Sequence, residues 1–318
     1  MRSVLASRST DLELVCVNDG SRDDTPDILE AWTRRDTRVR VLHQAAGGIV
    51  SALSTGLAEA RGPLVARMDA DDEIHPERLA AQGAFLDENP QLTLVGCGVE
   101  SFRDEGLAEG YRRYSEWVNQ LVAPDEIERE AFIECPVPHP TWMFRRDPIV
   151  ALGGYQERAW PEDLDLLYRL LAAGHRLGKV PRLLHRWRDH PDRLSRRDPR
   201  YGREAFSRVK AHYIGRIHPM PAAIVWGAGR TGRRLVRWLR TEGLRTRLLL
   251  DVNPARVGST WQGIPILSPT HLRQRAHAWR REGLRILAAV ARRGAREEIR
   301  QELVAHGLRE GEDFLMMA

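Results

Sequence analysis

The sequence predicts an α/β protein made of two successive domains. Over residues 12–68, short apolar runs alternate with segments of helical spacing, which is typical of strands joined by crossover helices. A second alternation begins near residue 222, where an apolar run enters a glycine-rich turn. We therefore expect a first domain at 1–200, a helical linker at 201–220 and a second domain at 221–318.

The first domain opens with strands at 12–17 and 39–42. A helix follows the first strand, because Pro26 suits the first helical position and apolar residues recur after it at helical spacing. A helix at 49–60 precedes the third strand at 64–68. These strands predict a parallel sheet whose ligands bind beyond the carboxyl ends of the strands.

Acidic side chains stand at that edge. Asp69, Asp71 and Asp72 close the third strand and would repel one another without a cation between them. Carboxylate oxygens suit Mg²⁺ or Mn²⁺, ions that usually also take oxygens from a substrate phosphate. The alternative is a solvated acidic turn that caps the next helix, since Asp favours turns. Asp19 closes the first strand, so the two groups together indicate a nucleotide with its metal.

Most of residues 1–200 resembles the family 2 glycosyltransferases with the GT-A fold. The resemblance rests on five stretches in the family's order: VCVNDGSRDDTPDIL, ARMDADDEIHPERL, PHPTWMFRRDPIVALGGY, WPEDLDLLYRLLAAG and RWRDHPDRLS. It implies a GT-A nucleotide-diphospho-sugar transferase domain. By the same resemblance Asp19 would accept a hydrogen bond from the nucleotide base, Asp69 would hold the ribose side, and Asp71 would bind the metal on the diphosphate.

The pair Glu162–Asp163 opens a predicted helix after Pro161. An inverting transfer needs a base that takes the proton of the acceptor hydroxyl, and one carboxylate suffices. From spacing alone the two are more simply read as ordinary acids of a first helical turn, where the helix dipole favours their ionised form. The resemblance favours a role in catalysis: it implies that Asp163 is the base and that Glu162 positions the acceptor or the loop.

Arg188 and His190 lie in a basic loop after an expected edge strand at 183–187. The resemblance implies that this loop covers the diphosphate, with Arg188 on phosphate oxygens and His190 completing the metal shell. A solvated basic loop is an equally good interpretation. His139, between two prolines, resembles the family segment on the acceptor side, and we do not assign it a catalytic role.

The chain departs from the family at its start. Relatives have a strand, a turn and most of a helix before the segment that matches residues 1–6. Such a strand is normally central, and its loss would expose the ladder groups of both neighbours. We therefore expect the native reading frame to begin upstream. The alternative is a truncated, inactive transferase domain.

The second domain carries Gly227, Gly229 and Gly232 as G-x-G-x-x-G between a strand and a helix. Asp251 closes the next strand, 251 − 232 = 19 residues after the last glycine, close to the spacing of a ribose-binding acid. The sequence predicts a small Rossmann-like unit that binds a nucleotide or dinucleotide. Three alternatives stay open: tight packing alone, dimerisation, and redox chemistry, although a dehydrogenase would need a partner domain.

The composition restricts the partners and the cellular location that we expect for the protein. The net charge is +5, but 49 basic residues are interspersed with 44 acidic ones, so we expect no nucleic-acid partner. Three cysteines, two of them in apolar runs, fit reduced core residues of a cytoplasmic protein. The sequence shows no signal peptide and no apolar run long enough for a membrane span, so any membrane contact would be peripheral, at the inner face.

The family resemblance, together with the acidic cluster, implies an inverting, metal-dependent glycosyltransferase that uses Mn²⁺ or Mg²⁺. It would move a sugar from a UDP- or dTDP-sugar donor to a glycan or lipid-linked acceptor in cell-surface polysaccharide assembly, with a homodimer as one possible state. The alternative is a nucleotide-binding or regulatory protein in which an inactive, truncated transferase domain supports a working Rossmann-like domain.

Overall fold

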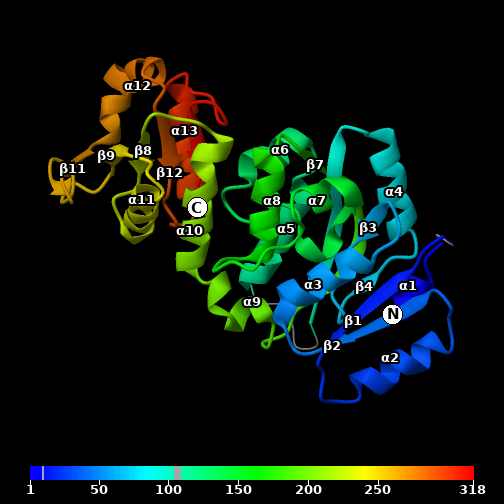
Figure 1. Ribbon diagram of the computed structural model, residues 1–318. Helices are drawn as coiled ribbons and strands as arrows, with labels where there is room; N and C mark the ends of the chain where they lie inside the picture. Colours follow the sequence, from blue (N-terminus) through cyan, green and yellow to red (C-terminus); the bar gives the residue numbers. More distant parts are fainter. Residues whose placement is uncertain (9–10, 104–108) are drawn as a thin grey trace. The chain divides into compact units, whose positions relative to one another are not determined.

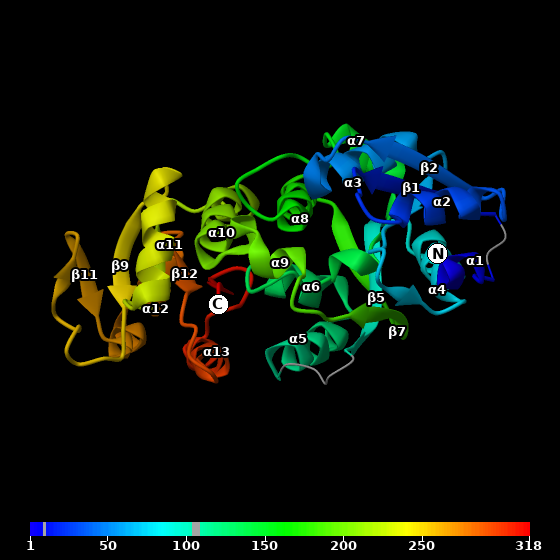
Figure 2. The same cartoon turned by 90° about the horizontal axis from the view of Figure 1, so that it is seen from below.

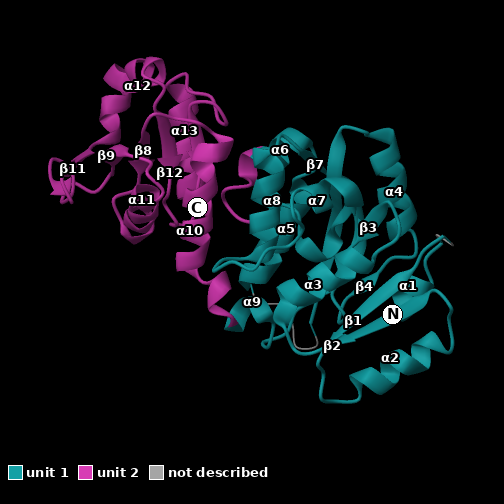
Figure 3. Ribbon diagram, in the orientation of Figure 1, with its two compact units in different colours: residues 1–128, 136–197 teal, residues 129–135, 198–318 magenta. Residues whose placement is uncertain are grey.

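The computed structural model describes residues 1–8, 11–103 and 109–318, which form two compact units (Figure 3). Unit 1 comprises residues 1–128 and 136–197, and unit 2 comprises residues 129–135 and 198–318. The chain therefore leaves unit 1 after Glu128, returns to it at Pro136, and passes to unit 2 again at Asp198.

Unit 1 alternates strands and helices along most of its length (Figure 1). Its strands are β1 (Leu14–Asp19), β2 (Val39–Gln44), β3 (Leu64–Ala66), β4 (Glu73–Ile74), β5 (Leu92–Phe102), β6 (Met143–Arg145) and β7 (Arg176–Arg188). Its helices are α1 (Arg2–Leu5), α2 (Thr25–Thr33), α3 (Gly48–Glu59), α4 (Arg78–Glu88), α5 (Glu109–Gln120), α6 (Pro124–Glu130, whose last two residues belong to unit 2), η1 (His139–Thr141), α7 (Arg146–Ala151), α8 (Glu162–Ala172) and α9 (Leu194–Arg197).

The strands of unit 1 form two hydrogen-bonded sheets. β1 and β2 pair in parallel, as predicted, and Figure 2 shows them side by side with α2 and α3 next to them. β3 pairs instead with β6, antiparallel, in a five-stranded sheet of order β3-β6-β5-β7-β4. The expectation that the first three strands share one parallel sheet is therefore wrong for the described residues. The three-residue β6 is too short for its alternation to be visible in the sequence.

The larger sheet is built around β5, which is buried from Leu92 to Val99. β7 lies between β5 and β4, so residues 183–187 are not in an edge strand as predicted. Pro181 sits at a bulge, since Cys97 pairs with Val180 while Gly98 pairs with Leu183. A bulge tolerates proline inside a sheet because its backbone nitrogen has no ladder hydrogen bond to donate.

Unit 2 is a second α/β layer structure. Its strands are β8 (Ala223–Trp226), β9 (Thr246–Leu250), β10 (Thr260–Trp261), β11 (Ile264–Leu267), β12 (Arg285–Ala288) and β13 (Phe314–Met316). Its helices are η2 (Pro199–Tyr201), α10 (Arg203–Ile217), α11 (Arg230–Thr241), η3 (Pro269–His271), α12 (Leu272–Arg281) and α13 (Ala295–Ala305).

The sheet of unit 2 has the order β10-β11-β9-β8-β12-β13. All its pairs are parallel except the β10–β11 hairpin. Counted along the chain, the parallel strands β11, β9, β8, β12 and β13 are third, second, first, fourth and fifth, which is the order of doubly wound nucleotide-binding sheets. Such sheets bind ligands where the order reverses, here between β8 and β12.

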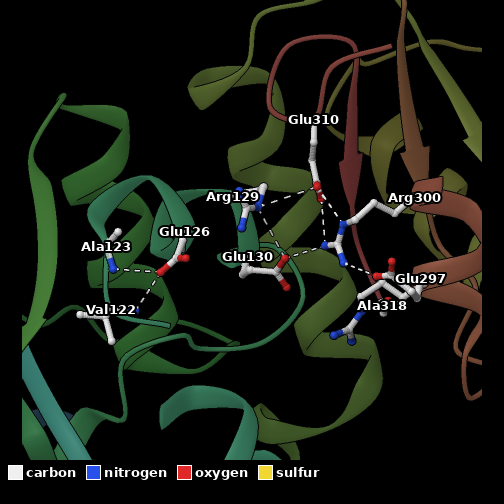
Figure 4. A network of polar contacts seen from close by, with 10 residues as sticks. Val122, Ala123, Glu126, Arg129, Glu130, Glu297, Arg300, Glu310 and Ala318 are labelled. Atoms are coloured by element: carbon white, nitrogen blue, oxygen red, sulfur yellow. Dashed lines mark hydrogen bonds and ion pairs between the residues drawn. The ribbon is translucent and has the colours of Figure 1, made fainter. Parts of the chain in front are cut away.

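The stretch expected as a linker forms α10, which packs on α11 within unit 2: Arg234 Nε donates to Ser207 Oγ at 2.8 Å, and Trp238 Nε1 donates to Glu204 Oε1 at 2.6 Å. Ionised and apolar contacts also hold residues 129–135 in unit 2. Figure 4 shows the Arg300 guanidinium between the carboxylates of Glu130 and Glu310.

The same segment is anchored through its backbone and its aromatic ring. Phe132 is fully buried, and its ring lies 5.8 Å from that of His218. Lys210 Nζ donates to Ile133 O at 2.8 Å and to Met317 O at 3.0 Å. Residues 129–135 therefore contribute core contacts to unit 2 although they lie in the first half of the sequence.

Candidate active site

The three aspartates that follow β3 come together in unit 1. Asp69, Asp71 and Asp72 each offer a carboxylate oxygen, and these oxygens lie within 4.8 Å of one another. Asp71 is exposed, Asp69 is half-buried and Asp72 is buried. This set of hard oxygen ligands could hold a divalent cation, as the sequence predicted.

Asp72 is fixed from two sides. His185 Nε2 donates to Asp72 Oδ2 at 2.8 Å, and the backbone N–H of Arg188 donates to Asp72 Oδ1 at 2.8 Å. Burial, followed by repulsion from Asp69, raises the pKa of Asp72 to about 8. A bound cation would relieve both costs, so the buried member of the cluster fits a metal site.

His185 was not singled out from the sequence. Its Nδ1 lies 2.9 Å from Arg78 Nη1, and because arginine can only donate, Nδ1 is the acceptor and Nε2 carries the proton toward Asp72. Burial and the nearby Arg78 charge lower the pKa of His185 to about 2, so the ring is neutral. His185 thereby holds Asp72 in place, as partners that do not themselves bind the metal commonly do for metal ligands.

The basic loop after β7 lies on the same cluster. His190 Nε2 is 3.2 Å from Asp71 Oδ2, and Arg188 Nε donates to the backbone oxygen of Asp71 at 3.2 Å. The Arg188 guanidinium also lies 4.7 Å from the ring centre of Phe102. The structure thus brings together Asp71, His190 and Arg188, to which the family resemblance assigned the metal and the diphosphate.

Asp19 lies at the carboxyl end of β1, as expected. Its carboxylate accepts hydrogen bonds from the N–H groups of Gly47 and Gly48 and from Gln44 Nε2, each at 2.8 Å. The bond from Gly47 is the main reason that its pKa is lowered. The metal-ligand group found in the described part of the chain does not include Asp19, so this carboxylate belongs to the β2–α3 side of the unit.

Glu162 and Asp163 begin α8 but differ in exposure. Glu162 is buried, with Oε1 3.7 Å from His139 Nδ1, whereas Asp163 is half-buried and its Oδ1 accepts from the N–H of Leu164 at 2.7 Å. His139 Nε2 lies 2.9 Å from the Tyr155 hydroxyl. Burial lowers the pKa of His139 well below its ordinary value, so the ring next to Glu162 is neutral.

Arg67 was quoted within a motif but given no role. Its Nη2 pairs with Asp69 Oδ1 at 2.6 Å, and the side chain is 9% exposed. Its charge acts on Tyr155 and Glu162 as well as on Asp69. Only the three-dimensional structure reveals this, because Arg67 and Glu162 are far apart in the chain.

The glycine-rich turn of unit 2 follows β8 as predicted. Gly227 has a φ of +122°, and a Cβ on Gly232 would lie 1.7 Å from Gly227 O, so both positions require glycine. A Cβ on Gly229 would meet only Arg256 Nη1, at 3.8 Å. Asp251 accepts from the N–H of Ala228 at 2.8 Å and from Arg256 Nη1 at 3.1 Å. Its carboxylate therefore holds the turn.

The chain is similar to several known proteins. Residues 1–153 match the sequence model of glycosyl transferase family 2. The amylovoran biosynthesis glycosyltransferase AmsE of Erwinia amylovora is 28% identical over 186 residues, which are 58% of this chain and 67% of AmsE. The O-antigen biosynthesis glycosyltransferase WbnJ of Escherichia coli is 29% identical over 172 residues, which are 53% of this chain and 64% of WbnJ.

Among solved structures, S. aureus TarS 1-349 in complex with UDP-GlcNAc aligns with a TM-score of 0.55 at 17% identity, covering 75% of this chain and 66% of that chain. The chain therefore shares the GT-A fold, as the sequence predicted. The similarity to glycosyl transferase family 2 covers the first 153 residues, just under half of the chain. The chain spans about two thirds of AmsE, WbnJ and TarS 1-349. None of the helices in the described ranges has the length and apolar character needed to cross a bilayer.

Proposed function

We propose that the protein is an inverting, metal-dependent glycosyltransferase that uses a UDP- or dTDP-sugar. The observation that carries this proposal is the cluster of Asp69, Asp71 and Asp72 at the end of β3, in a domain of a transferase family. A carboxylate cluster of this kind suits the cation that accompanies a nucleoside diphosphate. The complex of TarS with UDP-GlcNAc supports a nucleotide-sugar donor.

The metal would be held by Asp71 and His190, with Asp72 as a further candidate ligand. A bound Mn²⁺ or Mg²⁺ would stabilise the negative charge that develops on the departing diphosphate. Arg188 lies against the backbone of Asp71, and its guanidinium fork matches phosphate oxygens. We assign the nucleotide base to Asp19 and the ribose side to Asp69, in line with the family resemblance.

Asp163 is the proposed base. It must reach the acceptor hydroxyl, and its partial exposure at the start of α8 suits that task better than the buried position of Glu162. The first turn of the helix stabilises the ionised carboxylate, which is the form that accepts a proton. Glu162, beside the neutral His139, would position the acceptor.

The acceptor class is proposed from the relatives. AmsE acts in the biosynthesis of amylovoran and WbnJ in the biosynthesis of O-antigen, and both products are cell-surface polysaccharides. We therefore propose a glycan or a lipid-linked glycan as acceptor. An enzyme of this kind would work in the cytoplasm, with a peripheral contact at the inner face of the membrane.

A donor screen tests the proposed function. The purified chain would be mixed with a panel of UDP- and dTDP-sugars, with and without Mn²⁺, and both thermal stabilisation and slow donor hydrolysis would be measured. We expect one nucleotide class to stabilise the protein and to be hydrolysed only when Mn²⁺ is present. Absence of stabilisation and turnover across the whole panel would contradict the proposal.

We also propose that unit 2 binds a nucleotide or dinucleotide at the turn of Gly227, Gly229 and Gly232, with Asp251, whose carboxylate also holds that turn, as the ribose-binding acid. Support comes from the strand order, which puts the turn where the order reverses between β8 and β12. This site is the basis of a second candidate function, a nucleotide-responsive regulatory protein. Calorimetry with NAD⁺, NADH and UDP without metal would test it. Binding of NADH without donor turnover would favour the regulatory function, and a dimer without nucleotide binding would favour assembly.

A further inference from the structure

Arg67 interacts with one carboxylate on each side of the proposed transferase site, Asp69 and Glu162. It directly follows β3 and precedes Asp69 by two residues. Its N–H donates to Trp142 O at 2.8 Å, and its carbonyl accepts from Arg78 Nη2 at 3.0 Å. These two bonds fix the backbone from which the side chain extends.

The guanidinium is buried with incomplete hydrogen bonding. Nη2 pairs with Asp69 at 2.6 Å, while Nε and Nη1 are buried and have no hydrogen-bond partner among the described residues. Leaving a charged donor unsatisfied in the interior is costly, so such a group calls for a reason beyond packing. A long apolar side chain of similar volume would avoid that cost.

Arg67 also interacts electrostatically with a second carboxylate, that of Glu162. The charges of Arg67 and Glu162 interact, and each also acts on the Tyr155 hydroxyl. His139, which contacts both Glu162 and Tyr155, is kept neutral by burial and by Arg67 itself. Arg67 is therefore the permanently charged group in a buried set in which the histidine carries no charge.

We propose that Arg67 is a positioning residue shared by the donor and acceptor sides of the site, holding Asp69 through a direct ion pair and Glu162 through its charge. This inference rests on the proposed transferase function. Asp69 belongs to the cluster proposed for the donor and its metal, and Glu162 adjoins the proposed base, Asp163. One buried cation that attracts both carboxylates would help to hold their relative positions while the acceptor oxygen attacks.

The test combines Arg67→Met with Glu162→Gln. The readouts are calorimetric UDP binding with Mn²⁺ and the hydrolysis rate of whichever UDP-sugar the wild type hydrolyses fastest, where water replaces the acceptor. We expect Arg67→Met to lower kcat by roughly 10- to 100-fold, the usual cost of removing a partner that orients the residues of a site, with a smaller change in UDP affinity. Glu162→Gln should slow the Arg67→Met protein less than it slows the wild type, because the two act together.

The variant Arg67→Lys distinguishes a loss of positioning from a loss of folded structure. Lysine keeps the charge but lacks the planar fork, so it should restore part of the lost kcat. Arg145→Met is the matched control: Arg145 lies on β6 opposite Leu64, the other end of β3, and donates to the backbone oxygens of Leu92 and Leu86. Its loss should lower stability while leaving kcat per folded molecule unchanged.

Three outcomes would overturn the inference. They are wild-type turnover in Arg67→Met, strictly additive effects with Glu162→Gln, and an equal loss of kcat in Arg145→Met. If Arg67→Met does not fold, Arg67→Lys replaces it in the double-mutant comparison with Glu162→Gln. Additive effects of Arg67→Lys and Glu162→Gln on kcat would then contradict the inference. If the wild type neither binds UDP with Mn²⁺ nor hydrolyses any donor, the proposed function fails and this inference fails with it. If the wild type turns over a donor and the Arg67 variants are as active as the wild type, the inference is wrong but the proposed function stands.

Discussion

His185 and Asp72, 113 positions apart in the chain, share a 2.8 Å hydrogen bond that ties the acidic cluster to β7. The bond joins β7 to the turn after β3 and is buried on both sides. On its other edge the same imidazole accepts from Arg78. The histidine therefore links a fully buried arginine to the least exposed candidate metal ligand.

Replacing His185 with leucine should destabilise unit 1. It removes one partner of the Asp72 carboxylate and one partner of Arg78, and each buried group left unsatisfied costs about 1–3 kcal/mol. His185→Gln keeps one donor and one acceptor and should be milder. Urea unfolding of the three proteins measures the difference. Equal stabilities would show that the bond contributes nothing to the fold.

Asp163→Asn should separate binding from chemistry. The amide cannot accept the proton of the acceptor hydroxyl, so turnover should fall by roughly 10² to 10⁴-fold, a usual range for a general base. Donor affinity should stay close to wild type, because Asp163 does not belong to the metal-ligand cluster found in the described residues. The check is kcat together with calorimetric affinity for UDP and Mn²⁺. Full activity in this variant would make Glu162 the next candidate for the base.

Lys210 should make the stability of unit 2 depend on pH. Burial lowers its pKa from the ordinary 10.5 to about 8, so the charged form is costly in the folded state. Between pH 8 and 10.5 the folded protein releases this proton while the unfolded chain keeps it, and stability should rise with pH. The rise could reach ~3 kcal/mol, at about 1.4 kcal/mol per unit of pKa.

Lys210→Met is the reference for that measurement, since other titrating groups cancel in the comparison. The stability of the wild type relative to Lys210→Met should increase from pH 7.5 to pH 10, as followed by chemical unfolding. The neutral amine can still donate to Ile133 O and Met317 O, so the hydrogen bonds survive the proton loss. A difference that is flat or falls with pH would contradict the expectation.

Gly232→Ala should disrupt the β8–α11 turn. The added methyl group would lie 1.7 Å from the carbonyl oxygen of Gly227, which is backbone and cannot move away freely. We expect a loss of at least ~1–3 kcal/mol, the cost of overpacking. Gly229→Ala is the control, since the nearest atom lies at 3.8 Å. Thermal melts of both variants measure the effect, and an unchanged melting temperature in Gly232→Ala would contradict the tight contact.

The sequence was informative where function depends on neighbours in the chain. The run Asp69-Ala70-Asp71-Asp72 predicted a carboxylate cluster because three acids within four residues after a strand must lie close together. Likewise the glycine spacing predicted the turn between β8 and α11. Strand positions β1 and β2 followed from apolar runs and their parallel pairing from the helix between them.

Contacts between distant segments could not be predicted in this way. No local pattern shows that His185 meets Asp72 or that Arg67 acts on Glu162, since each pair is joined only by the folded sheet. The apolar residues of 129–135 gave no sign that they would pack in unit 2, because hydrophobicity does not specify a partner. The pairing of β3 with the short β6 could not be predicted either, because the backbone hydrogen bonds between two strands do not depend on particular side chains.

The central claim is a metal-dependent nucleotide site at the acidic cluster, and Asp71→Asn tests it most directly. The amide preserves the size of the side chain but loses the charge that would offset a cation beside Asp72 and His190. Calorimetry of UDP binding, with and without Mn²⁺, would be run on wild type and variant. We predict Mn²⁺-dependent binding in the wild type and at least a tenfold weaker, nearly metal-independent affinity in Asp71→Asn, equivalent to about 1.4 kcal/mol. Equal affinity and equal metal dependence in the two proteins would contradict the account.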